Sequence, residues 1–398
     1  MSLIPLAGPD HSALDAAVAE YEAAVAAQVA ATAEAMAALT AAAVVAGARI
    51  AELRAQLAAA LNPPPPAPEL IELLDFSKSV GRVLPAAGYT GKGIGKTIIT
   101  MRPFSSTQSP PTAKGTTNPL RLLRTASGTG GRFGGFTLQG TPQGKPTQHM
   151  YGGLMIAGQK GATVSDVLIR AIPGNAGGPP GETFGASDFK CTGITWTRVE
   201  VDGRDASGTM TKPPDGSSRV GASGLAANSS VDVEWDDCYI HDHYYGMPTA
   251  WDTVGFITRN LRSIGNWRGI NHERVTGVVE HHNPTLVLAP GDSGRNALHH
   301  LSFNNDIADC PTISVFAPVW SGGHPAAGGA LCVSIAANYA GGKQKQTSVP
   351  KFFNADGTPM FVAHASVAAN AAMGVAARPA AGMAQALADP KHSVVVFG

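Results

Sequence analysis

The stretch Ile194-Thr-Trp196-Thr-Arg-Val199 alternates apolar and polar residues, which is the period of a β-strand with one buried face. Similar stretches follow it: Val233-Glu-Trp235-Asp-Asp-Cys238, Phe256-Ile-Thr-Arg-Asn260-Leu261, Val278-Val-Glu-His-His-Asn283, Leu301-Ser-Phe303-Asn-Asn305-Asp306 and Val333-Ser-Ile335-Ala-Ala-Asn338. Their first residues are separated by 39, 23, 22, 23 and 32 positions. A period of 22 to 23 residues accommodates three short strands and three turns, so it predicts a solenoid whose turns stack on one another.

The two longer intervals contain polar, glycine-rich insertions at residues 204–224 and 319–329. We expect apolar residues of the repeated strands to point inward, at Val167, Ile169, Ile194, Trp196, Val233, Trp235, Leu301, Phe303, Val333 and Ile335. Asn and Asp tolerate the left-handed backbone of tight turns, and they recur near the strand ends as Asp237, Asn260, Asn283, Asn305 and Asn338. The pattern therefore predicts a mainly β fold, a right-handed parallel β-helix over residues 85–345.

A long helix is predicted ahead of the β-helix, because residues 12–61 contain no proline, one glycine and much alanine. About 50 residues at ~1.5 Å each give a rod of roughly 75 Å. Its larger side chains recur every three or four positions, with one four-residue stutter between Val25 and Val29. This seam comprises Leu14, Val18, Tyr21, Val25, Val29, Thr32, Met36, Leu39, Ala43, Ala46, Ile50, Leu53 and Leu57.

A single helix cannot bury such a seam against itself, and three arrangements would cover it. The helix packs on other copies of itself as a coiled coil, docks along a neighbouring protein, or folds back as a hairpin within the chain. The heptad spacing favours the coiled coil, with Leu14, Val18, Tyr21, Val25, Val29, Met36, Leu39, Ile50, Leu53 and Leu57 as its oligomerisation residues. The sequence does not fix the number of strands.

The chain divides into four parts in this interpretation: the coiled-coil helix at 1–61, a linker at 62–84, the β-helix at 85–345 and a C-terminal cap at 346–398. Four consecutive prolines at 63–66 end the helix and form a stiff spacer. The linker's second half, 69–75, is expected to form a short amphipathic helix. The cap is expected to hold one or two short helices, broken at Pro379 and Gly382, and a final strand at 392–397.

Composition excludes several classes of protein. Lys plus Arg and Asp plus Glu both number 29, so the chain lacks the surplus positive charge of a nucleic-acid binder. No apolar stretch is long enough to insert into a membrane. Four cysteines at 191, 238, 310 and 332 lack metal-site spacing and are expected to be buried free thiols. Residues 88–97 resemble a phosphate-binding loop but have Thr90 where its first glycine is needed, and no cofactor is expected.

The order of coiled coil, proline linker and β-helix resembles the minor tail proteins, tail fibres and tailspikes of tailed phages, whose β-helix is similar to pectate-lyase-like folds. This resemblance implies a homotrimer in the virion tail, attached to other tail proteins through its N-terminal helix. It also implies synthesis in the host cytoplasm and action at the host cell surface, on cell-wall polysaccharide. The chain departs from many such proteins, because it lacks their Gly-Asp-Gly and Asp-Asp-Thr entry segment. A catalytic role is therefore less expected.

Candidate functional residues concentrate between Asp236 and Glu273. Paired carboxylates cleave glycosidic bonds, and the candidates are Asp237, Asp242, Asp252 and Glu273, with Arg274 suited to a lyase. Flat aromatic rings cover sugar faces, and the candidates for glycan binding are Tyr239, Tyr244, Tyr245, Trp251 and Trp267. The histidine pairs 241/243 and 281/282 lack third and fourth ligands, so no metal is expected. A purely structural role for all these residues is the third alternative.

The sequence thus favours a structural tail protein that assembles as a homo-oligomer and contacts envelope glycans. The alternative is a β-helical hydrolase or lyase that degrades a polysaccharide.

Overall fold

The computed structural model describes residues 16–37, 39–40, 69–73, 80–101, 121–140, 152–172, 184–204, 223–243, 248–289, 299–304, 312–335, 350–367, 377–379 and 382–397. The chain forms two units, Met1–Pro66 and Ala67–Gly398. The first contributes a helix and the second is mainly β.

The N-terminal helix spans residues 16–37 and 39–40, and every described side chain on it is exposed. The apolar seam is therefore bare within this chain: Val18, Tyr21, Val25, Val29, Met36 and Leu39 are 46, 71, 43, 62, 60 and 67% exposed. Leu14, Ile50, Leu53 and Leu57 lie outside the described residues. One helix is what the structure contains, so its association into a coiled coil remains a prediction. No helix among the described residues is long and apolar enough to cross a membrane.

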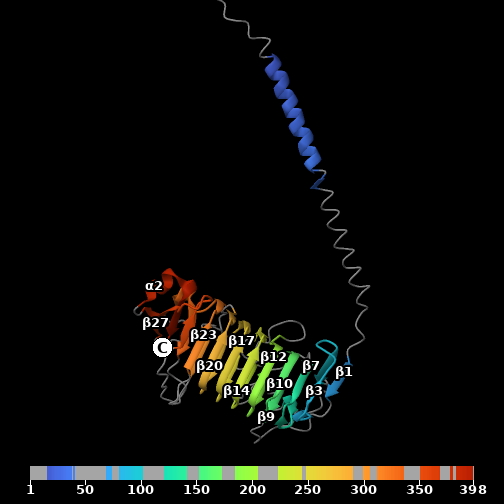
Figure 1. Cartoon of the computed structure of the whole chain (residues 1–398), viewed down its shortest axis with the longest axis vertical. Coiled ribbons are helices and arrows are strands. Elements are labelled where there is room, and N and C mark those ends of the chain that lie inside the picture. The colour runs from blue at the N-terminus through green and yellow to red at the C-terminus, as the bar shows by residue number, and fades with distance from the viewer. Residues whose placement is uncertain are drawn as a thin grey trace, which may run out of the picture. The chain divides into compact units, whose positions relative to one another are not determined.

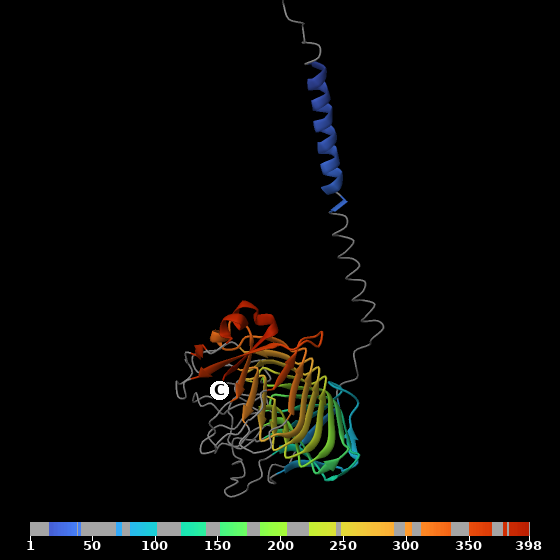
Figure 2. The same ribbon diagram turned by 60° about the vertical axis from the view of Figure 1, so that its left-hand side comes forward.

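The second unit contains two large sheets (Figures 1 and 2). The 17-stranded sheet holds β1 (Glu69–Leu73), β3 (Gly88–Thr90), β4 (Thr97–Met101), β6 (Gly128–Thr129), β7 (Arg132–Gln139), β9 (Gln159–Lys160), β10 (Thr163–Arg170), β12 (Thr192–Asp202), β14 (Val231–Asp236), β15 (Tyr239–His241), β17 (Val254–Arg259), β18 (Arg262–Asn266), β20 (Thr276–His282), β21 (Thr285–Leu288), β23 (Thr312–Phe316), β24 (Val319–Ser321) and β26 (Lys351–Phe353). The 12-stranded sheet holds β2 (Val80–Leu84), β5 (Arg121–Thr125), β8 (Gly152–Ala157), β11 (Phe184–Phe189), β13 (Ser223–Asn228), β16 (Thr249–Trp251), β19 (Ile270–Glu273), β22 (Leu301–Asn304), β25 (Leu331–Ile335), β27 (Phe361–Val367), β28 (Ala377–Pro379) and β29 (Ser393–Phe397).

Each turn of the chain visits both sheets. One turn runs through β13 in the 12-stranded sheet, then β14 and β15 in the other, and returns to the first sheet as β16. Every strand pairs in parallel with its counterpart one turn later, as Val233 does with Phe256 and Ala250 with His272. Among the described strands only β27 and β28 pair antiparallel. The architecture is therefore that of a parallel β-helix-like solenoid, as the repeat predicted.

The phase of the repeat was partly wrong. The first four predicted strands lie in the 17-stranded sheet, but those at Leu301 and Val333 lie in the other one, as β22 and β25. The true successor of β20 is β23, with Val279 opposite Ile313. The interval from Val278 to Leu301 matches the period only because one face follows another within a turn. Apolar-polar alternation is the same on every face, so periodicity alone did not separate them.

The corners between faces use left-handed residues. The corner inside the 17-stranded sheet has φ between 49° and 56° at Asp166, Arg198, Asp237, Asn260, Asn283 and Ala317. Their backbone N–H groups continue the ladder; that of Asp237 donates to the Arg259 carbonyl at 2.9 Å. The turn role predicted for Asp237, Asn260 and Asn283 is confirmed, whereas Asn305 and Asn338 lie outside the described residues.

The predicted inward residues line the core. Nine of the ten are buried, and Ile335 is half-buried against the same cluster. Trp196 pairs with Trp235 across adjacent turns, and the Trp235 ring meets Phe256 edge-on at 4.7 Å between centroids. Cys191, Cys238 and Cys332 are buried free thiols, as predicted.

Two local predictions were wrong. Residues 69–73 form strand β1, not a helix, because Leu70 and Ile71 pair with Ile98 and Ile99 of β4; this pairing overrides the local helical pattern. Toward the C-terminus the described chain forms strand β27, at 361–367, before a single short α-helix, α2 (Met383–Ala388). The final strand, predicted at 392–397, is confirmed as β29, and it pairs with β25 at the end of the solenoid.

Candidate functional site

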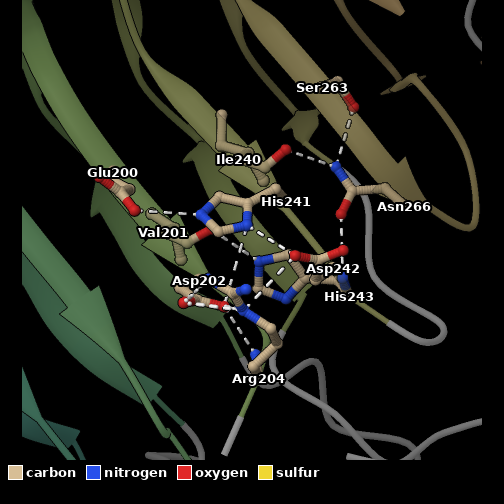
Figure 3. Close-up of polar contacts among 10 residues, drawn as sticks. All are labelled: Glu200, Val201, Asp202, Arg204, Ile240, His241, Asp242, His243, Ser263 and Asn266. Carbon is tan, nitrogen blue, oxygen red and sulfur yellow. Dashed lines mark hydrogen bonds and ion pairs between the residues drawn. The ribbon is translucent and has the colours of Figure 1, made fainter. Parts of the chain in front are cut away.

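A cluster of charged side chains lies where strands β12 and β15 end. Glu200 and Asp202 come from β12, directly opposite Tyr239 and His241 of β15. Val201 and Ile240 between them are buried in the core, so the charged residues alternate with core residues and lie on the outer side of the sheet. Arg204 and Asp242 follow the two strand ends and complete the cluster (Figure 3).

His241 is clamped between two carboxylates. Its Nε2 lies 3.1 Å from Glu200 Oε1 and its Nδ1 lies 2.9 Å from Asp242 Oδ2. Because a carboxylate only accepts, both ring nitrogens donate, and the ring is an imidazolium. Burial alone would lower the pKa of His241, but the hydrogen bonds to Glu200 and Asp242 outweigh burial and raise it.

Arg204 neutralises the other acids of the cluster. Its Nη2 lies 2.7 Å from Asp202 Oδ2, and its Nε lies 3.5 Å from Asp242 Oδ2. Burial raises the pKa of the Asp202 carboxyl, but the hydrogen bonds from Arg204 outweigh that effect and leave the pKa lowered. The cluster is therefore a closed network in which three acids share two cations.

Buried amides and rings anchor this network to the core. The Asn266 side chain accepts from the His243 backbone N–H at 3.0 Å and donates to the Ile240 carbonyl at 2.7 Å. The His243 ring Nε2 lies 3.2 Å from the Val201 carbonyl oxygen. Figure 3 shows these contacts beside His241. The charged residues are thus held on rigid strand ends.

Metal-ligating atoms of Glu200, Asp202 and His241 all lie within 4.8 Å of one another. A divalent cation would use this kind of donor set. Each atom already has a protein partner, however, since His241 binds Glu200 and Asp242 while Asp202 binds Arg204. The cluster is better described as an ion-pair network.

The four candidate catalytic carboxylates have separate surroundings. Asp237, Asp242 and Asp252 are all left-handed corner residues. Asp237 and Asp242 flank β15, so about five residues at ~3.3 Å each put them roughly 16 Å apart, beyond the range of a hydrolytic pair. Asp252 forms a two-pronged ion pair with Arg274. Glu273 accepts a hydrogen bond from Asn271 at 2.9 Å.

The described aromatic candidates are spread over the molecule, and each contacts an arginine. Tyr239 is in the 17-stranded sheet and Trp251 in the 12-stranded sheet, while Trp267 follows β18. Arg262, Arg274 and Arg268 lie 4.6, 5.4 and 4.5 Å from the respective ring centroids. The Tyr239 ring also stacks on His241 at 4.1 Å. Tyr244 and Tyr245 lie outside the described residues.

Sequence reasoning missed Glu200, Asp202 and Arg204. The signal was present in the spacing: the 39 residues from Ile194 to Val233 also separate Glu200 from Tyr239 and Asp202 from His241. Extending the register of the core residues along the strands would have placed these side chains together.

Comparisons with known proteins gave no match, whether with family models, curated proteins or solved structures.

The clamp on His241 predicts its titration. Glu200→Gln is expected to lower the His241 pKa, because it removes one of the two carboxylates that stabilise the imidazolium. A raised histidine pKa stabilises the fold below about pH 6.5 and is lost as pH rises through the folded value. Histidine ring NMR measures the pKa directly. Glu280→Gln, which alters the separate Glu280–His282 pair, is the matched control. A wild-type His241 pKa at or below about 6.5 would contradict the clamp.

Proposed function

We propose that the chain is a structural, homo-oligomeric binding protein of the phage tail-fibre kind. Its N-terminal helix associates with copies of itself and with neighbouring tail proteins, and its right-handed β-helix contacts polysaccharide at the host cell surface. A homotrimer in the virion tail is the form favoured by the resemblance in chain organisation.

The observation that carries this proposal is the exposed seam on the N-terminal helix. Six large apolar side chains, from Val18 to Leu39, are each at least 43% exposed. Their spacing keeps them on one stripe, which is the arrangement that packs against an identical stripe. A helix of this kind gains most of its stability from packing, so an isolated copy would be marginal in water.

The binding part of the proposal rests on the outer surface of the solenoid. Rings beside guanidinium groups, such as Tyr239 with Arg262, combine an apolar face with hydrogen-bond donors, the pair of features that sugar recognition requires. The charged groups around His241 are mutually neutralised. They therefore support binding better than cleavage, which needs a carboxyl group kept protonated near a substrate.

Val25→Asp is expected to dissociate the oligomer, because it puts a charge into the middle of the seam. Ala27→Asp is the matched control, since it places the same residue on the opposite side of the helix and costs the same helix propensity. Light scattering on the intact chain measures the mass of each variant. The same two proteins are then compared for sedimentation with host cell-wall polysaccharide, where loss of avidity should follow loss of the oligomer. Equal masses for the two variants would refute the seam as the oligomerisation surface.

A further inference from the structure

Arg268 is a charged residue without an ion-pair partner. It lies between β18 and β19, and its side chain is half-buried. Burial lowers the pKa of its guanidinium, and the charge of Glu273 offsets only part of that effect. Among the residues that the structure describes, none makes a hydrogen bond or an ion pair with this guanidinium. Its contact is the face of the Trp267 ring, 4.5 Å away. An arginine this surrounded by protein is ordinarily paired.

His299 lies beside Arg268 in the next turn. Ile270 pairs with Leu301, so Arg268 is in register with His299, one strand spacing of about 4.8 Å away. The Gly269 N–H donates to the His299 carbonyl at 3.3 Å. The His299 Nε2 atom is buried and makes no hydrogen bond within the described part of the chain. Two neighbouring turns thus present two groups with unmet hydrogen-bonding capacity.

The surroundings of His299 concentrate positive charge. Burial, followed by the charges of Arg268, His324 and His300, lowers the pKa of His299 to about 3. The ring edges onto Phe397 at 5.7 Å, and His324 contacts the same ring at 4.8 Å. Glu273 is the acid that acts on Arg268, and its carboxylate already accepts from Asn271. An incoming negative group would meet a guanidinium and an imidazole that lack other partners.

We propose that Arg268 and His299 bind an oxyanion: a carboxylate, phosphate or sulfate group, free in solution or carried by a larger ligand. The guanidinium supplies a planar fork of donors, which matches such groups, and His299 adds a donor from the adjacent turn. A bound anion also stabilises the imidazolium of His299, so binding takes up a proton and strengthens as pH falls. This site is separate from the oligomerisation seam and does not depend on it.

Calorimetric titration of the full chain with sodium phosphate, sulfate and acetate at constant ionic strength tests the site. Arg268→Met is expected to weaken binding at least about tenfold, because it removes a charged hydrogen-bond donor. Arg259→Met is the matched control, since Arg259 is already paired with Glu234 at 2.8 Å. His299→Gln is expected to remove the strengthening between about pH 7.5 and about pH 6.

Thermal unfolding without added anion separates a ligand site from a structural arginine. Removing an unpaired charge should leave the melting temperature of Arg268→Met unchanged or raise it, whereas phosphate should raise that of the wild type alone. Failure of Arg268→Met to fold, or a marked fall in its melting temperature, would show a structural arginine and overturn the proposal. The proposal is equally overturned if the wild type binds none of the three anions saturably. Unchanged binding by Arg268→Met would identify an adventitious ion only.

Discussion

Acidification from about pH 7 to about pH 5 is expected to lower the free energy of unfolding by several kcal/mol, because four histidines are buried in the neutral state. Burial lowers the pKa of His272 to about 4, of His300 to about 4 and of His299 to about 3, and it lowers that of His281 well below its usual value. These rings must become charged when the chain unfolds into acidic water. The unfolded state therefore gains stability relative to the fold.

Hydrogen bonds explain why the two innermost rings stay neutral. The Thr258 hydroxyl donates to His281 Nδ1 at 2.8 Å, and His281 Nε2 lies 3.0 Å from His272 Nε2. His272 Nδ1 lies 3.1 Å from the Ser302 carbonyl oxygen, which only accepts. His272 must therefore donate through Nδ1 and accept through Nε2, while His281 donates through Nε2. Each ring holds one proton in a fixed tautomer, and a second proton would break the chain of hydrogen bonds.

The size and sign follow from the pKa shifts. A base whose pKa is lowered by folding costs stability below its unfolded value of about 6.5, and the cost grows until pH reaches the folded value. By pH 5 this amounts to about 2 kcal/mol for each of His272 and His300, with His281 and His299 adding to it. Asp188 acts in the opposite direction, since burial raises its pKa to about 7. Its protonation in the fold returns about 2 kcal/mol over the same range, so the histidines outweigh it.

Urea unfolding at several pH values measures this effect. Asp188→Asn removes the opposing group and should make the acid loss steeper, whereas His282→Gln alters a half-buried ring outside this buried chain and should leave the profile unchanged. A flat profile between about pH 7 and about pH 5 would show that the rings are not buried as neutral bases.

Trp235→Ala is expected to destabilise the protein by about 3–5 kcal/mol, because it leaves a large cavity inside the solenoid. The side chain has no exposed surface, and it packs between Trp196 of one turn and Phe256 of the next. Trp235→Phe should cost roughly half as much, because it keeps most of the ring and removes an N–H that has no described partner.

The matched control for this core substitution is Val254→Ala. Val254 begins β17, in the strand next to Trp235, but it is 43% exposed. We expect a change within about 0.5 kcal/mol, since surface truncations away from special features cost little. Urea unfolding compares the three variants. A loss below about 1 kcal/mol for Trp235→Ala would contradict the stacked aromatic core.

The sequence predicted the solenoid because its core rule is local: each turn repeats apolar-x-apolar and ends on a residue that tolerates positive φ. Trp196, Trp235 and Asp237 were placed correctly on those grounds. The faces were confused at Leu301 because all faces share one alternation. Strand β1 was missed because its partner, β4, lies 28 residues later (Glu69 to Thr97), and local pattern does not report such a pairing.

The candidate site was only half predictable. Asp242 and His241 stood out within a dense polar run, but Glu200 and Asp202 looked like ordinary outward residues of a long strand. They become a site only through the parallel register of β12 with β15. Asp237, Asp242 and Asp252 attracted attention as acids, yet their shared property is the corner conformation. Arg268 was noted beside Trp267, but its lack of a partner is visible only once its neighbours are known.

The mass of the intact chain in solution tests the central claim most directly, because the exposed seam has no partner within one chain. Light scattering on the full-length protein is expected to give a multiple of the 40.7 kDa chain mass, three chains in the form we propose. A mass of a single chain would contradict the account of the N-terminal helix as an oligomerisation element, and with it the proposed fibre.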